Sequence, residues 1–293
     1  MNSDQIPLAY VNGEISPVSE ARISILDRGF LFADGIYDVL RISGRTPLFF
    51  QEHMERLRRS AGGILIDDIP SAELIRGIAV DLIGRSGISE GNLYIQLTRG
   101  ICPGGRRCDS PLPSKSSLVL MIYPVHVVPQ DKYMDGVKVR TELDIRWNYN
   151  DYKTINLLPR VVARLKNITP DFYEVVYKDA KGHILEGTST NVFIVKDGVV
   201  VTPPLSHLLL PGITRQVLIE QARKGGIRVE EGIVSIGDLR EADECFLTGT
   251  TTEVLGVVSV DDFTIGGGRV GEVARRLRNL YLEGVCDYIG NWR

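Results

Sequence analysis

The chain has 293 residues, of which 43% are hydrophobic and 24% are charged, and its formal net charge is -3 at pH 7. This composition is ordinary for a globular protein, and the length lies where a single core begins to divide into two domains. The negative net charge argues against general binding to nucleic acid or to an acidic membrane surface. Because no apolar run approaches the roughly 18 residues of a membrane span and Met1 precedes no secretory pattern, no membrane association is expected.

The cysteines and histidines show no metal-ligating pattern. Cys102, Cys108, Cys245 and Cys286 form no CxxC pair, and the four histidines are widely scattered. No metal site is therefore predicted. The simplest interpretation is a cytoplasmic protein with reduced thiols.

The first part of the chain predicts a hairpin followed by strands and helices. Asn12-Gly13 is a favourable hairpin turn between the short segments 8–11 and 14–15. Alternation over residues 35–41 predicts a strand with Tyr37, Val39 and Arg41 on one face. Apolar spacing then predicts helices at 51–62 and 71–85 and strands at 92–98 and 117–128.

The second part of the chain mixes strands, hairpins and helices. Asp197-Gly198 is a strong turn signal between two predicted strands. The predicted strands are 137–143, 173–178, 191–195 and 199–202, and the predicted helices are 157–166, 215–225 and 270–289. This order favours an α+β fold over a doubly wound parallel sheet. We expect an N-terminal α+β domain at 1–125, a linker at 126–135 and a C-terminal α/β domain at 136–293.

One lysine lies in a segment suited to chemistry. In DIRWNYNDYKTIN, residues 144–156, Lys153 stands between Tyr152 and an apolar run, directly before a predicted helix. In a partly apolar pocket the pKa of a lysine falls, and its amine becomes a nucleophile. A single lysine is also often a solvated surface residue, so both interpretations stay open.

Three further segments are rich in small polar residues. They are ILEGTSTNVF at 184–193, LPGITRQV at 210–217 and LTGTTTE at 247–253. In the second segment Thr214 is expected to be the N-cap of a helix, whose first N–H groups form an anion site. The alternative for the first segment is an ordinary turn between strands. For the second segment it is a plain capped helix, and for the third it is a turn that binds no ligand. The chain has no GxGxxG, GxxxxGK[ST] or GxSxG motif, so dinucleotide, P-loop and hydrolase interpretations lack support.

Taken together, these segments resemble the fold-type IV enzymes that use pyridoxal 5′-phosphate (PLP). This family includes D-amino-acid aminotransferase, branched-chain aminotransferase and aminodeoxychorismate lyase. The matching stretches occur in family order over nearly the whole chain: LDRGFLFADGIYDV, EHMERL, YIQLTRG, DIRW, DYKTINLL, LEGTSTNVF, LLLPGITRQV and LTGTTTEV. The resemblance implies a two-domain α+β fold whose C-terminal domain carries most of the cofactor site.

The resemblance also implies roles for individual residues. Lys153 matches the Schiff-base lysine, which shuttles a proton between the substrate Cα and C4′ of the cofactor. Glu186 matches the carboxylate that pairs with the pyridine nitrogen and keeps the ring an electron acceptor. The remaining cofactor contacts would be Arg56, Ile213, Thr214, Gly249 and Thr250 at the phosphate, Leu210 on one ring face and Thr190 beside the cofactor.

The substrate-binding residues are less clearly marked by the resemblance. Tyr37 matches a tyrosine that lines the substrate pocket. Typical D-amino-acid aminotransferases carry an Arg-x-His pair after the TRG strand, and this chain lacks that histidine. Arg106 or Arg107 is a candidate to bind the substrate carboxylate bidentately. Arg41, on the face of Tyr37, is a further candidate, although it is equally suited to the protein surface.

The activity implied is transamination. The expected reaction moves an amino group between a D-amino acid, such as D-alanine or D-glutamate, and a 2-oxo acid such as 2-oxoglutarate. The stretches DRGFLFADGIYDV, DIRW and KTINLLP are more similar to the D-specific branch. The alternatives are an aminotransferase for branched-chain L-amino acids, an aminodeoxychorismate lyase and a non-catalytic PLP-binding module. Family members are homodimers, so a homodimer is expected.

Overall fold

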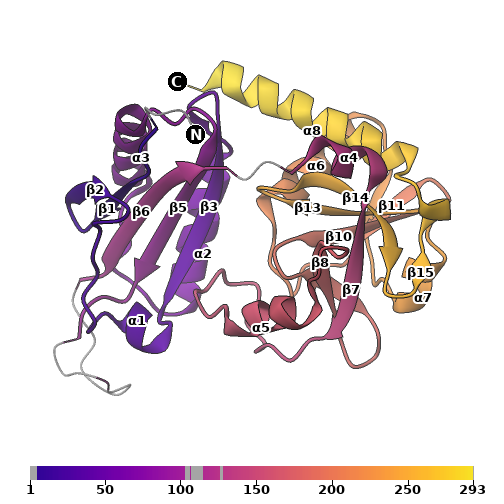
Figure 1. Ribbon diagram of the computed structural model, residues 1–293, viewed down its shortest axis with the longest axis horizontal. Coiled ribbons are helices and arrows are strands. Elements are labelled where there is room, and N and C mark those ends of the chain that lie inside the picture. Colours follow the sequence, from indigo (N-terminus) through magenta and orange to yellow (C-terminus); the bar gives the residue numbers. More distant parts are fainter. Residues whose placement is uncertain (1–4, 103–105, 107–114, 126–127, 293) are drawn as a thin grey trace. The chain divides into compact units, whose positions relative to one another are not determined.

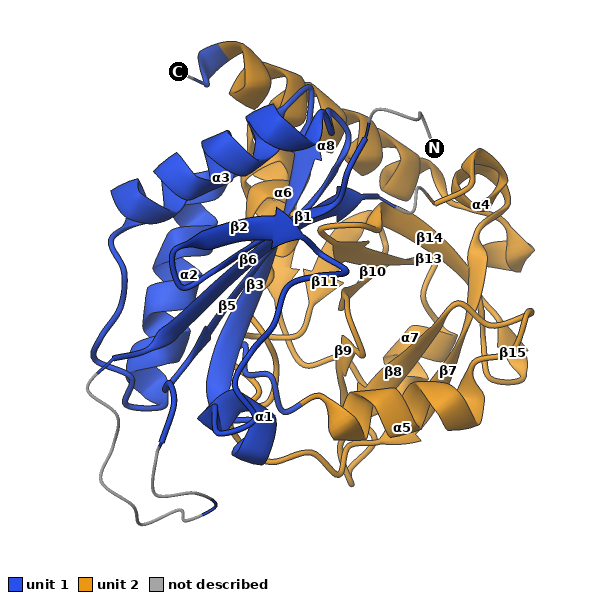
Figure 2. Ribbon diagram, turned by 60° about the vertical axis from the view of Figure 1, so that its left-hand side comes forward, with its two compact units in different colours: residues 1–126, 152–156, 291–293 blue, residues 127–151, 157–290 orange. Residues whose placement is uncertain are grey.

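The computed structural model describes residues 5–102, 106, 115–125 and 128–292. The chain divides into two compact units (Figure 2): unit 1 contains residues 1–126, 152–156 and 291–293, and unit 2 contains residues 127–151 and 157–290. The predicted domain boundaries stay a prediction. The units differ from them because residues 152–156 and the chain end belong to unit 1, and because a helix, Gln130–Asp135, forms inside the predicted linker.

Unit 1 is built on an antiparallel sheet, and two of its helices, α2 and α3, pack on one face of that sheet. The strands are β1 (Leu8–Val11), β2 (Glu14–Pro17), β3 (Gly35–Ser43), β4 (Thr46–Pro47), β5 (Gly91–Thr98) and β6 (Ser117–Pro124), and the helices are α1 (Arg28–Phe32), α2 (Phe50–Gly63) and α3 (Ala72–Ser86). The strand order is β2-β1-β6-β5-β3-β4. The predicted hairpin is confirmed: Asn12 and Gly13 have φ values of 50° and 115°, the positive values that a type I′ turn requires.

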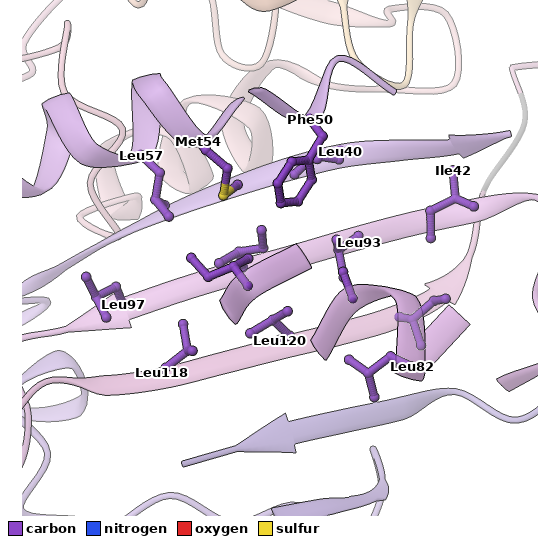
Figure 3. Close-up of a cluster of buried hydrophobic side chains, with 14 of the residues drawn as sticks. Leu40, Ile42, Phe50, Met54, Leu57, Leu82, Leu93, Leu97, Leu118 and Leu120 are labelled. Atoms are coloured by element: carbon purple, nitrogen blue, oxygen red, sulfur yellow. The ribbon is translucent and has the colours of Figure 1, made fainter. Parts of the chain in front are cut away.

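The core of unit 1 follows from the alternation along β3. Ile36, Leu40 and Ile42 are fully buried, whereas Tyr37 and Arg41 are half-buried on the opposite face, as predicted. Figure 3 shows the buried face packed with side chains from the neighbouring strands and from α2 and α3. Each such aliphatic side chain contributes about 1.5–3 kcal/mol when it leaves water. The core therefore fixes which face of β3 carries the candidate substrate residues.

Unit 2 contains a mixed sheet. Its elements are α4 (Gln130–Asp135), β7 (Val137–Leu143), α5 (Leu158–Asn167), β8 (Glu174–Lys178), β9 (Ile184–Gly187), β10 (Asn191–Lys196), β11 (Val199–Thr202), α6 (Ile213–Lys224), β12 (Val229–Glu231), α7 (Ile236–Arg240), β13 (Glu244–Gly249), β14 (Glu253–Val260), β15 (Phe263–Thr264), the 3-10 turn η1 (Gly266–Gly268) and α8 (Glu272–Asn291). The strand order is β12-β11-β10-β13-β14-β7-β8-β9, with β15 paired to β14. Since β9 also pairs with β10, the strands from β10 to β9 close into a barrel.

The strand directions in unit 2 confirm the α+β prediction. β7 runs parallel to both β8 and β14, whereas β13 runs antiparallel to its neighbours β10 and β14. The predicted turn at Asp197-Gly198 is confirmed, with φ values of 51° and 76°. Strands β13 and β14 were not predicted, because both are buried on two sides and show little alternation. Within the described part of the chain, no helix has the length and hydropathy needed to cross a membrane.

Candidate active site

Lys153 lies on a short segment of unit 1 that pairs with the beginning of β3. The backbone N–H of Tyr37 donates to the carbonyl of Lys153 over 2.9 Å, and Thr154 forms an antiparallel bridge with Ile36. On its other side, the N–H of Lys153 donates to Oγ of Ser60 in α2 over 3.0 Å. The backbone of Lys153 is therefore held from two directions.

The side chain of Lys153 contacts a predicted substrate residue. Its Nζ lies 4.5 Å from the centroid of the Tyr37 ring, and that ring stacks on Tyr94 with centroids 5.7 Å apart. Burial raises the pKa of Tyr94, so its hydroxyl stays protonated and donates to Gln96 over 2.6 Å. Two predicted site residues, Lys153 and Tyr37, are thus brought together, and an aromatic pair supports them.

Arg56 is buried against a carboxylate. Its Nε and Nη2 donate to the two oxygens of Asp38 over 3.0 Å and 2.7 Å, and His53 Nδ1 lies 2.8 Å from Asp38 Oδ1. Burial raises the pKa of Asp38, but the charge of Arg56 and the hydrogen bonds from Arg56 and His53 outweigh this effect and hold that pKa well below its usual range. Arg56 is therefore rigidly placed on α2, and its role at a phosphate stays a prediction.

Of the three arginines proposed for the substrate carboxylate, the structure describes Arg41 and Arg106, which lie on separate segments of unit 1. Arg41 Nη2 lies 2.9 Å from Glu90 Oε2, so this guanidinium already has an acidic partner. Arg106 is exposed, with its guanidinium carbon 5.9 Å from the centroid of the Phe32 ring. Arg107 lies outside the described residues. The choice among these three arginines stays a prediction.

Glu186 of β9 is a buried carboxylate in unit 2, held by three donors. Its Oε1 accepts from Nη1 of Arg146 over 2.6 Å and from Nη2 of Arg160 over 2.9 Å. Its Oε2 accepts from the backbone N–H of Leu210 over 2.9 Å. A carboxylate offers about four lone-pair directions. These contacts leave one direction on Oε2 for a further donor, such as a protonated ring nitrogen.

Sequence reasoning missed the two arginines that hold Glu186. The DIRW stretch matches the family, but that match assigns no role to Arg146, and Arg160 lies outside every matching stretch. Burial lowers the pKa of Arg146, but Asp144 and Glu186 more than reverse this effect, so the guanidinium stays charged. The sequence carried no usable signal for Arg160, because its position on the predicted helix, away from the apolar residues Val161 and Leu165, indicates a solvent-exposed side chain.

A second buried glutamate in unit 2 was also missed. Glu174 of β8 is fully buried and accepts from Oγ of Ser189 over 2.8 Å and from Nη1 of Arg164 over 2.9 Å. It also accepts from Oγ1 of Thr190 over 3.3 Å. Thr190, the predicted neighbour of the cofactor, therefore lies beside Glu174. The available signal was the position of Glu174 in the apolar run EVVYK. A glutamate on a buried strand is expected to have hydrogen-bonding or charged partners, because an unpaired buried carboxylate is costly.

The beginning of α6 differs from the prediction. The helix starts at Ile213, and Gly212 is its N-cap, without a side-chain cap bond. The predicted N-cap role of Thr214 is therefore wrong: Gly212 has the extended φ and ψ of -68° and 137°, and Thr214 lies within the first turn. The first-turn N–H groups and the dipole of α6 still make this end suited to an anion.

Asn191 joins the beginning of α6 to the strands around Glu186. It pairs with Glu186 in β9 and with Thr248 in β13. Its Nδ2 donates to the carbonyl of Leu210 over 2.9 Å, and its Oδ1 lies so close to Gly212 that a Cβ at that position would clash with it. One asparagine therefore brings three separate segments of the predicted site together.

The turn between β13 and β14 completes this group. A Cβ on Gly249 would lie 3.3 Å from the carbonyl oxygen of Ser189 and 3.5 Å from Cγ2 of Thr190. The neighbouring Oγ1 of Thr248 is buried and has no hydrogen-bond partner within the described residues. An orphaned hydroxyl, a helix beginning and a Gly-Thr turn at 249–250 fit a phosphate group, and Glu186 fits a pyridine nitrogen. The residues of unit 2 thus fit PLP.

The comparisons with known proteins identify the class. Residues 35–260 match the family model described as Amino-transferase class IV. The chain therefore belongs to the class IV aminotransferases, which are the fold-type IV PLP-dependent enzymes, and the predicted family is confirmed.

Individual relatives cover almost the whole chain. It is 33% identical over 283 residues to a D-alanine aminotransferase of Listeria innocua serovar 6a, covering 96% of both chains. Among solved structures, it resembles the branched-chain amino acid aminotransferase of Escherichia coli, with a TM-score of 0.87, 24% identity, and coverage of 96% of this chain and 95% of that one. It also resembles 4-amino-4-deoxychorismate lyase from Pseudomonas aeruginosa, with a TM-score of 0.82, 24% identity, and coverage of 94% and 98%. At that identity, the structural likenesses show the fold.

Proposed function

We propose that this PLP-dependent aminotransferase moves the amino group between a D-amino acid, such as D-alanine or D-glutamate, and a 2-oxo acid such as 2-oxoglutarate. The substrate class is supported by the D-alanine aminotransferase relative, which is 33% identical along 96% of the chain. One observation supports the proposed binding of PLP. The buried carboxylate of Glu186 accepts from three donors, and one lone-pair direction on Oε2 is left for the ring nitrogen.

Specific residues of the chain would hold the cofactor. Glu186 would accept from the ring nitrogen, Leu210 would pack on a ring face and Thr190 would lie beside it. The phosphate would be bound by the N–H groups of Ile213 and Thr214, by the Thr214 hydroxyl, by Gly249 and Thr250, and by Arg56. When bound, PLP supplies an aldehyde for the amino group and a ring that accepts electrons from the substrate Cα.

The proton movement falls to Lys153. Its Nζ would take the proton from the substrate Cα and deliver it to C4′, the cofactor carbon that carries the aldehyde. The Tyr37 ring, 4.5 Å from Nζ, would orient the amine and line the substrate pocket. Arg41, Arg106 and Arg107 remain the candidates to bind the substrate carboxylate, because a guanidinium fork matches its two oxygens.

A homodimer is part of the proposal. On α5, Leu158, Val161, Val162 and Leu165 are exposed by 69%, 46%, 37% and 80%. Their spacing of three and four residues places them along one side of the helix. An exposed apolar stripe of this kind is typical of a protein–protein interface. We therefore place the contact between two copies of this chain on α5.

The proposed location is the cytoplasm. Among the described residues, Cys245 is a buried free thiol and Cys286 is an exposed free thiol. Free thiols are typical of proteins kept in a reducing compartment.

The experiment that tests the activity is a panel of D- and L-amino acids with 2-oxoglutarate, using PLP-loaded protein. We expect D-alanine to yield pyruvate and D-glutamate in equal amounts, measured by chiral chromatography. Preference for L-leucine or L-valine would instead support the branched-chain alternative. Pyruvate released without matching consumption of 2-oxoglutarate would support a lyase. Protein that binds PLP but reacts with no amino donor would support the non-catalytic module.

A further inference from the structure

Helix α5 presents polar side chains to the interior of unit 2. It lies beside β8 (Figure 1). Arg160, Arg164 and Asn167, spaced four and three residues apart, point inward, and each contacts a glutamate: Glu186, Glu174 and Glu142, respectively. The apolar residues of α5 described above face outward instead. This arrangement reverses the usual amphipathic helix, in which the apolar side faces the core.

Arg160 holds the segment around Glu186 at two points. Its Nη2 donates to Glu186 Oε1 over 2.9 Å, and its Nη1 donates to the carbonyl of Thr188 over 2.9 Å. The side chain is only 16% exposed. A guanidinium used in this way fixes both the carboxylate and the backbone two residues later. A merely solvated arginine would make neither contact.

The charges around Glu186 give Arg160 a distinct part. Arg146 also reaches Glu186, but its Nε and Nη2 are engaged with both oxygens of Asp144 over 2.9 Å and 2.8 Å. Asp144 thus balances the charge of Arg146. Within the described residues, the ion pairs of Arg160 include no other carboxylate. Arg160 is therefore the counter-ion that belongs to Glu186 itself.

We infer that Arg160 is a positioning residue that fills Oε1 of Glu186 and so leaves Oε2 as the acceptor for the cofactor ring nitrogen. This inference rests on the proposed function. Hydrogen bonds to the ionised form of a carboxylate favour that form. With Arg146 and Arg160 both donating to Oε1, the proton shared between Oε2 and the ring nitrogen stays on the nitrogen. Without Arg160, Oε1 regains a free lone pair, and the proton is drawn toward the carboxylate.

The test uses PLP labelled with ¹⁵N in its ring, loaded into four proteins: wild type, Arg160→Gln, Arg160→Lys and Lys166→Gln. Lys166 is an exposed cation on the same helix and serves as the charge control. In Arg160→Gln, the ring ¹⁵N resonance should move toward that of unprotonated PLP. The kcat should fall about tenfold with little change in KM, because a hydrogen bond to a charged group is lost. In Arg160→Lys, the retained cation should keep the ring ¹⁵N resonance close to that of wild type. Lys166→Gln should match wild type in both the resonance and kcat.

Each outcome bears on a separate claim. An unchanged ¹⁵N resonance in Arg160→Gln, or an equal movement in Lys166→Gln, would overturn the role of Arg160. If Arg160→Gln does not fold, as judged by thermal melting, Arg160→Lys still tests the inference, since a resonance moved toward unprotonated PLP despite the retained charge would overturn it. Wild-type protein that takes up no PLP would overturn the proposed function instead.

Discussion

Arg146 donates through Nη1 to Oε1 of Glu186 over 2.6 Å, while its Nε and Nη2 donate to Asp144. The guanidinium is 3% exposed, and the two carboxylates are 3% and 7% exposed. A buried group of charges is stable only when complete, because removing one member leaves others without compensation. Arg146 therefore stabilises the fold as well as holding the carboxylate of Glu186 in place.

Replacing Arg146 should therefore destabilise the fold. We expect Arg146→Gln to lower the free energy of unfolding by about 3 kcal/mol, since two buried carboxylates lose their shared partner. Urea denaturation followed by circular dichroism measures this change. The control is Arg228→Gln, because Arg228 and Glu230 form an ion pair with side chains 73% and 47% exposed. Exposed pairs contribute about 1 kcal/mol at most. Equal effects of the two substitutions would contradict the prediction.

Replacing Lys153 should abolish turnover and leave the fold intact. In Lys153→Ala, the hydrogen bonds to Ser60 and Tyr37 persist, because they use the backbone of residue 153. Loss of the proton-transferring amine should reduce kcat by at least about 100-fold. A coupled assay for pyruvate and a thermal melt measure the two properties. Lys196→Ala is the control, since Lys196 lies at the end of β10 and pairs with exposed Glu241. Wild-type turnover in Lys153→Ala would assign proton transfer to another group.

The free energy of unfolding should depend on pH partly through the protonation of His53. Burial lowers the pKa of His53 from its ordinary value of 6.5, against the opposing effect of Asp38. Below pH 6.5 the unfolded chain therefore binds a proton that the folded chain does not. The stabilisation from neutral His53 is complete above that pH, and it is lost as the pH falls toward the folded-state pKa. The slope due to this one group approaches about 1.4 kcal/mol per pH unit.

The matching substitution is His53→Gln, which does not titrate and retains an N–H donor for Asp38. Denaturation at a series of pH values from 7.5 to about 5 should show a shallower loss of stability in this variant than in wild type. His183→Gln is the control, because His183 is 35% exposed and pairs with Asp179, which is 28% exposed. Parallel curves for wild type and His53→Gln would show that another group causes the loss.

Assembly should depend on the outward face of α5. Leu165 is 80% exposed at the end of the apolar stripe. In Leu165→Glu, dimer formation would bury a charge without a partner, so the dissociation constant of the dimer should rise at least tenfold, about 1.4 kcal/mol. Analytical ultracentrifugation over a concentration series measures it. Leu74→Glu provides the control, since Leu74 is 53% exposed on α3. An unchanged dimer in Leu165→Glu would exclude α5 as the interface.

Local patterns in the sequence predicted many elements but not all strands. The turns at Asn12-Gly13 and Asp197-Gly198 were predictable because positive φ values are a local preference of these residues. The alternation of β3 was equally readable, since one of its faces is buried. Strands β13 and β14 gave no such signal, because their buried patterns run continuously.

The sequence by itself determined the family, and it marked Lys153 and Glu186 through short stretches whose order along the chain is specific. Only the tertiary structure decided what surrounds them. The three groups that hold Glu186 come from residues 146, 160 and 210, and the carboxylate that holds Arg56 comes from Asp38 on another element. Such partners are chosen by burial, which requires every charge and hydrogen-bonding group to find a complement wherever the fold supplies one. That requirement acts across space, so no local pattern in the chain records it.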